Sequence, residues 1–158
     1  MHKIDVEKGS KDSTVSRQWA MRPDDEKFLS LGALRDQVKT WRDQSYVQPM
    51  KPADINVIYD EKNPEFLRFM LGDKALDPTH FAFGQVCAMA GVPADYARTL
   101  PGPLASINLN YGLKAIEQKN KAAYLRENGS SIMRAVTSPS YGRIFDEDIA
   151  AAVMEIAG

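Results

Sequence analysis

Apolar side chains recur at helical spacing in several parts of the chain. The clearest stripe is formed by Leu31, Leu34, Val38 and Trp41, and it predicts a helix over 31–43 with Ser30 as its N-cap. The same reasoning predicts four more helices, each bounded by a proline, a glycine or an acidic first turn, over 78–91, 93–100, 103–118 and 146–156.

Two pairs of short apolar runs predict β-hairpins. The first pair covers 55–59 and 66–70, with a turn-forming stretch between them. The second pair covers 122–126 and 132–136, and the dipeptide Asn128-Gly129 between them favours a type I′ turn, whose two central residues both have positive φ.

These elements together indicate an α+β fold. We expect two β-hairpins, near 55–70 and 121–136, packed against a group of three to five helices. The 158 residues are 44% hydrophobic and 26% charged, which suits one globular domain, expected over 16–158. Residues 1–15 lack an apolar period, so we expect them to form a flexible N-terminal arm.

Composition removes several classes of chemistry. A single cysteine and two histidines cannot supply a four-ligand Cys/His zinc site, a disulfide framework or a haem attachment motif, and we expect no metal and no cofactor. The net charge of -1 excludes a uniformly basic nucleic-acid binder. The polar first residues and the absence of a long apolar run predict a cytoplasmic protein without membrane contact.

No recognisable catalytic set is present. Phosphate-binding glycine loops, the HExxH motif and EF-hand spacing are all missing. Cys87 and His80 are seven residues apart, about 10 Å along a helix axis, which is beyond hydrogen-bond reach. We interpret Cys87 as a buried apolar residue and His80 as a packing or capping residue, and we expect the protein not to be an enzyme.

Charge is unevenly distributed towards the end of the sequence. Residues 114–143 contain six basic and two acidic residues, whereas residues 144–158 contain four acidic residues and no basic one. Such patches can meet phosphates or a charged protein, although they can also be solvated or neutralise each other. Our candidate partner-binding residues are nine charged side chains of this region and one tyrosine: Lys114, Lys119, Lys121, Arg126, Arg134, Tyr141, Arg143, Asp146, Glu147 and Asp148.

The order and spacing of four stretches resemble a known family. Residues 79–85, 91–101, 109–113 and 134–144 together resemble the phage/plasmid-like protein family, a domain of unknown function. The resemblance implies that the gene comes from a phage, a plasmid or a related element, and that this chain is a shortened version of a longer protein. It assigns no catalytic residue.

Three functions follow as hypotheses. The first is a binding protein of a mobile element that inhibits a host nucleoprotein defence complex, as anti-CRISPR proteins do, by protein–protein contact. The second is a DNA-binding accessory protein of phage replication, recombination or repair that uses the basic residues between 114 and 143. The third is an enzyme of an unrecognised type, for which His80 and Cys87 are the only candidate pair.

Overall fold

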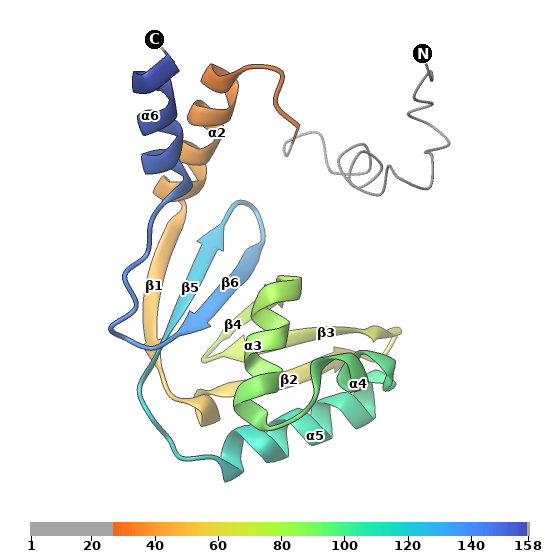
Figure 1. Cartoon of the computed structure of the whole chain (residues 1–158). Helices are drawn as coiled ribbons and strands as arrows, with labels where there is room; N and C mark the ends of the chain where they lie inside the picture. Colours follow the sequence, from red (N-terminus) through yellow and green to blue (C-terminus); the bar gives the residue numbers. More distant parts are fainter. Residues whose placement is uncertain (1–26, 158) are drawn as a thin grey trace, which may run out of the picture. The chain divides into compact units, whose positions relative to one another are not determined.

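The computed structural model describes residues 27–157 (Figure 1). The arm expected over residues 1–15 therefore lies outside the described residues. The chain divides into two compact units, of which the larger covers residues 43–143. The smaller unit contains the described residues 27–42 and 144–157. The α+β class predicted from the sequence is confirmed.

A six-stranded mixed sheet forms the body of the larger unit. Its order is β1-β5-β6-β4-β3-β2, and all neighbouring strands are antiparallel except β4 and β6, which are parallel. Both expected hairpins are present, and β4 joins them into one sheet. The strands are β1 (Ser45–Met50), β2 (Ile55–Asp60), β3 (Asn63–Leu71), β4 (Lys74–Pro78), β5 (Lys121–Glu127) and β6 (Ser131–Thr137).

Two of these strands, β1 and β4, were not foreseen from the sequence. β1 contains Pro49, which usually argues against a strand, but β1 is an edge of the sheet, where a missing N–H can face away from the ladder. β4 has only five residues and ends at Pro78, and only Asp77 and Pro78 are in register with β6. Neither strand has the alternating pattern that reveals a half-buried strand.

Three helices of the larger unit occupy the stretch where three were expected. They are α3 (His80–Ala90), α4 (Ala94–Thr99) and α5 (Gly102–Ala115). Thr79 caps α3, because its Oγ1 accepts a 3.1 Å hydrogen bond from the N–H of Ala82. Gly91 ends α3 in the left-handed conformation, with φ of 70°. The expected end of α5, near residue 118, was too late by one turn.

The core lies between the sheet and helices α3 and α5, which pack against each other as well as against the strands (Figure 1). Fully buried side chains come from both layers, among them Phe69, Leu76, Val86, Leu109 and Met133. Polar side chains also join the layers. Asn110 on α5 bonds both backbone groups of Val57 on β2, at 2.7 Å to N and 2.9 Å to O.

The loop of the second hairpin differs from the expected type I′ turn. Gly129 has a φ of 81°, but Asn128 does not have a positive φ. A type I′ turn requires a positive φ at both central residues, so this loop is not of that type. Instead, residues 128–130 form a three-residue loop in which the N–H of Asn128 donates to the carbonyl oxygen of Ser130 at 3.1 Å. The hairpin itself is confirmed, with a register shift between Tyr124 and Leu125.

The smaller unit is built on α2 (Leu31–Asp43) and α6 (Asp146–Ala157). The bounds of α2 agree with those expected, and the Oγ of Ser30 accepts a hydrogen bond from the N–H of Ala33. Arg42 joins the two helices through ion pairs of 2.9 Å to Glu147 and 3.0 Å to Asp148.

Candidate binding surfaces

The structure brings three of the predicted basic residues to one end of the larger unit. Lys114 is exposed in the last turn of α5, Lys119 is exposed in the following connection, and Lys121 is half-buried at the start of β5. Lys51 lies at the same end, because it follows Met50, the register partner of Lys121. We call Lys51, Lys114, Lys119 and Lys121 the lysine cluster.

A hydrogen bond joins two of the segments that carry the lysine cluster. The N–H of Ala53 donates to Oε1 of Gln118 at 2.8 Å, which ties the 3-10 turn η2 (Pro52–Asp54) to the connection after α5. Figure 1 shows this turn beside the end of α5. Glu117 forms a 3.0 Å ion pair with Lys119, so the cluster keeps only a modest positive excess.

The predicted arginines and the tyrosine do not extend this cluster into one surface. Arg126 is only 7% exposed, so it offers a partner little surface, contrary to its selection as a contact residue. Arg134 is half-buried in β6. Tyr141 is exposed, while its carbonyl oxygen accepts a 3.3 Å hydrogen bond from the hydroxyl of Tyr124, and Arg143 lies 5.2 Å from the centroid of the Tyr124 ring.

The three predicted acidic residues belong to the smaller unit. Asp146, Glu147 and Asp148 form the first turn of α6, where carboxylates interact favourably with the helix dipole. The hydrogen bond from Arg42 to Glu147, with a further contribution from Asp148, raises the pKa of the Arg42 guanidinium. Two of the three carboxylates are therefore already engaged within their own unit.

The outer side of α5 is a surface that the sequence analysis missed. Leu104, Ile107 and Tyr111 are 50%, 65% and 77% exposed. They lie three and four residues apart, on one side of the helix, whereas Leu109 and Leu113 face the core. Leucines and isoleucines occur on more than one side of this helix, so only the packing separates an inner from an outer face. We call Leu104, Ile107 and Tyr111 the α5 stripe.

Three polar side chains from β1, β4 and the end of β5 form a cluster at another position of the larger unit. Lys74 Nζ donates to Tyr46 Oη at 2.6 Å and to Glu127 Oε1 at 2.7 Å, and Tyr46 Oη donates to Glu127 Oε1 at 2.8 Å. The bond from Lys74 lowers the pKa of Glu127, and the same bond raises the pKa of Lys74. The contribution of Glu127 to the free energy of unfolding is lost as the pH falls through the pKa of Glu127 in the folded protein. The contribution of Lys74 is lost as the pH rises through the pKa of Lys74 in the folded protein.

Cys87 and His80, the one candidate pair for nucleophilic chemistry, have opposite surroundings. Cys87 is fully buried, and desolvation raises the pKa of its thiol to about 11 despite the nearby charge of Arg98. His80 is exposed in the first turn of α3, and Thr79 rather than His80 caps that helix. The interpretation of Cys87 as a buried residue is thus confirmed, and that of His80 as a packing or capping residue is wrong.

We therefore expect Cys87 to resist alkylation in the folded protein. At about pH 8 its thiol remains protonated and is shielded from reagents, and the thiolate is the reactive form. Iodoacetamide labelling, followed by intact mass spectrometry, should be slow in native buffer and complete in concentrated urea. Because the chain has one cysteine, any mass increase of one adduct reports this residue. Rapid, complete labelling without denaturant would contradict the expectation.

Comparisons with known proteins give no match. No protein-family model, no curated protein and no solved structure matches this chain. Within residues 27–157, no group of three or more histidine, cysteine, aspartate or glutamate side chains is arranged to hold a metal ion. No helix in the described part of the chain is long and apolar enough to cross a bilayer.

Proposed function

We propose that the protein is a binding protein of phage or mobile-element origin that inhibits a host nucleoprotein defence complex by protein–protein contact, as an anti-CRISPR protein does. It acts in the host cytoplasm and catalyses no reaction. The α5 stripe is the observation that supports this proposal, because apolar side chains exposed on successive helical turns are typical of a surface that a partner covers.

The lysine cluster supports a nucleoprotein as the partner. Lys114 follows Tyr111 by three residues, so the α5 stripe leads directly to the cluster. Apolar side chains pack against protein, whereas lysines pair with phosphates or carboxylates. A complex of protein with nucleic acid offers both kinds of surface within one interface.

The alternative function, a DNA-binding accessory protein, would use the same lysines. The grouping of Lys51, Lys114, Lys119 and Lys121 at one end favours it, because lysine–phosphate contacts need only local positive charge. Bare DNA would leave the α5 stripe in water. The two functions therefore differ in whether the apolar residues of α5 contribute to binding.

Ile107→Asp tests the proposed inhibitor. We expect it to weaken binding to the purified target complex by about thirtyfold, the loss typical of an interface hot spot, because it places a charge in the centre of the α5 stripe. Binding is measured by biolayer interferometry against a panel of purified CRISPR effector–guide RNA complexes, with cleavage of target DNA as the functional readout. Phe81→Asp is the matched control, because Phe81 on α3 is also 65% exposed.

Two results would overturn the inhibitor in different ways. The inhibitor proposal would be wrong if the wild-type protein, at micromolar concentration, neither bound any complex of the panel nor inhibited its cleavage of DNA. Salt-sensitive binding of a labelled oligonucleotide that is lost in Lys114→Glu/Lys121→Glu but retained in Ile107→Asp would instead favour the DNA-binding accessory protein.

A further inference from the structure

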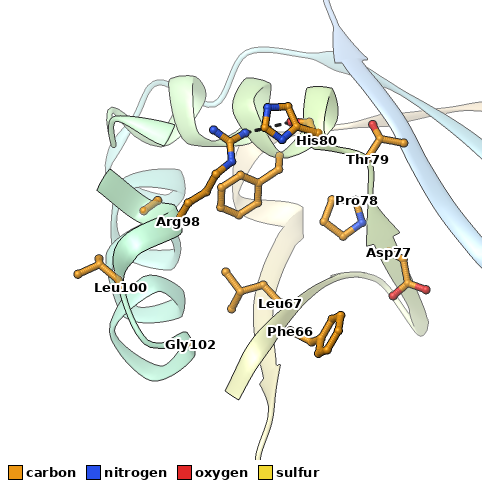
Figure 2. Close-up of a pocket in the computed structure, with 11 residues that line it drawn as sticks. Phe66, Leu67, Asp77, Pro78, Thr79, His80, Arg98, Leu100 and Gly102 are labelled. Atoms are coloured by element: carbon orange, nitrogen blue, oxygen red, sulfur yellow. Dashed lines mark hydrogen bonds between the residues drawn. The ribbon is translucent and has the colours of Figure 1, made fainter. Parts of the chain in front are cut away.

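A pocket of about 500 Å³ opens in the larger unit where strands β3 and β4 meet the beginnings of α3 and α5 (Figure 2). This volume is within the range of sites that hold small organic molecules. Neither the α5 stripe nor the lysine cluster lines the pocket, so it is separate from the residues on which the proposed function rests.

Most of the lining is apolar. Leu67 on β3, Phe83 on α3 and Leu100 after α4 contribute to its walls, together with Phe66, whose side chain is largely exposed. Figure 2 shows Phe66 and Leu67 across the pocket from Arg98. An apolar group entering the pocket would remove these side chains from water, which favours binding.

Arg98 supplies a positive charge held in a fixed position. Its Nη2 donates to the carbonyl oxygen of His80 at 3.2 Å, and its guanidinium carbon lies 5.2 Å from the centroid of the Phe83 ring. Its Nη1 donates to Asp95 at 3.1 Å, but the carboxylate of Asp95 is fully exposed and such surface ion pairs are weak. A guanidinium has five N–H donors, so Arg98 can bond a further acceptor.

The charges around the pocket favour an anion at the Arg98 end. Asp77 is the carboxylate in the lining, and it forms a 2.7 Å ion pair with Arg68. Figure 2 shows Asp77 and Arg98 on opposite sides of the pocket. The first residues of α3 and α5, His80 and Gly102, also line it, and helix N-terminal ends carry partial positive charge.

We propose that this pocket binds a small organic acid, an aromatic or branched aliphatic monocarboxylate. The apolar part of the ligand packs against Leu67 and Phe83, and its carboxylate accepts hydrogen bonds from Arg98. A peptide with a free C-terminal apolar residue presents the same two groups, and the binding experiment distinguishes it from a free acid. The site would give a protein that acts by contact a means of responding to a metabolite.

Binding of 3-phenylpropanoate to the 158-residue chain tests the proposal. It is measured by isothermal titration calorimetry and by amide chemical shifts in NMR spectra. We expect millimolar or tighter binding, with shifts centred on His80 and Arg98. The alcohol 3-phenylpropanol and the amine 3-phenylpropylamine have the same apolar part without the negative charge, and we expect each to bind at least about tenfold more weakly.

Variants of Arg98 test whether this residue binds the carboxylate of the ligand. Arg98→Gln should weaken 3-phenylpropanoate binding about tenfold or more, as expected for loss of a charge-assisted hydrogen bond, and Arg98→Lys should restore part of the affinity. Arg35→Gln makes the same charge change at an exposed position of α2 and should bind like the wild type. Circular dichroism verifies that each variant is folded.

Several outcomes would overturn the proposal. They are equal affinity for the acid and the alcohol, unchanged affinity in Arg98→Gln, shifts that lie away from the pocket, or no binding at millimolar concentration. Tighter binding of a short peptide with a free C-terminal phenylalanine than of 3-phenylpropanoate would also overturn it, because the occupant would then be a peptide. The comparison of acid with alcohol uses the wild-type protein and is independent of any variant.

Discussion

Replacing Gly112 by alanine is expected to lower the free energy of unfolding by about 3 kcal/mol, the upper end of the usual cost of overpacking. Gly112 lies on α5 where this helix crosses the end of α3. A Cβ at this position would overlap the carbonyl oxygen of Ala90 and would lie 2.8 Å from the carbonyl carbon and 2.9 Å from the Cα of that residue. These are backbone atoms, so no side chain can rotate away and the helices must separate.

Urea denaturation followed by circular dichroism measures this effect. Alanine is a better helix former than glycine by about 1 kcal/mol, so a net loss of stability must come from the contact with Ala90. Gly32→Ala is the control, because Gly32 is also a helix residue, in the first turn of α2, but has nothing within 4 Å of the added Cβ. The control should be neutral or stabilising. Equal urea midpoints for the two variants would show that α3 and α5 do not cross this closely.

Replacing Asn110 by leucine should cost about 2 to 3 kcal/mol of stability, because it leaves a buried backbone donor and a buried acceptor without partners. β2 is an edge strand of the sheet, and Val57 in it is almost fully buried. The side-chain amide of Asn110 bonds both backbone groups of Val57 in the place of another strand. Leucine can form neither bond.

Asn108→Leu is the control for this prediction. Asn108 is on the same helix, but it is exposed and its amide donates to the carbonyl oxygen of Leu104 in the preceding turn. Its replacement should change the unfolding free energy only slightly, as most surface substitutions do. Equal stabilities of Asn110→Leu and Asn108→Leu in thermal and urea unfolding would contradict the role of Asn110. Asn110→Asp, which keeps the acceptor for the N–H of Val57 but loses the donor, should be less destabilised than Asn110→Leu.

Local signals account for what the sequence predicted well. The helix cap Ser30 and the left-handed Gly91 act within one turn of their own backbone, so the residue types are enough to place the ends of α2 and α3. Strand β1 has no such local signal. Pro49 is tolerated in it only because β1 lies at the edge of the sheet. That position depends on β5, which lies more than seventy residues later in the chain.

The candidate binding surfaces and the pocket were also hard to predict, because they depend on contacts between residues that are far apart in the chain. Alternation along β5 places Tyr124 and Arg126 on one face, but it does not reveal that both are buried. The cover over Tyr124 comes from residues 141–143, in the segment after β6. Likewise, the pocket at Arg98 combines side chains from β3, β4, α3 and α4. A site assembled from several elements becomes visible only when their packing is known.

The parallel pairing of β4 with β6 affects how the chain folds during its synthesis. Residues 43–115 contain four strands and the three central helices, yet one edge of β4 stays open until residues 131–137 have been made. An open strand edge is a template for pairing with other chains. The larger unit can therefore complete its core only after β6 has left the ribosome, and a chain released before that point would be prone to aggregation.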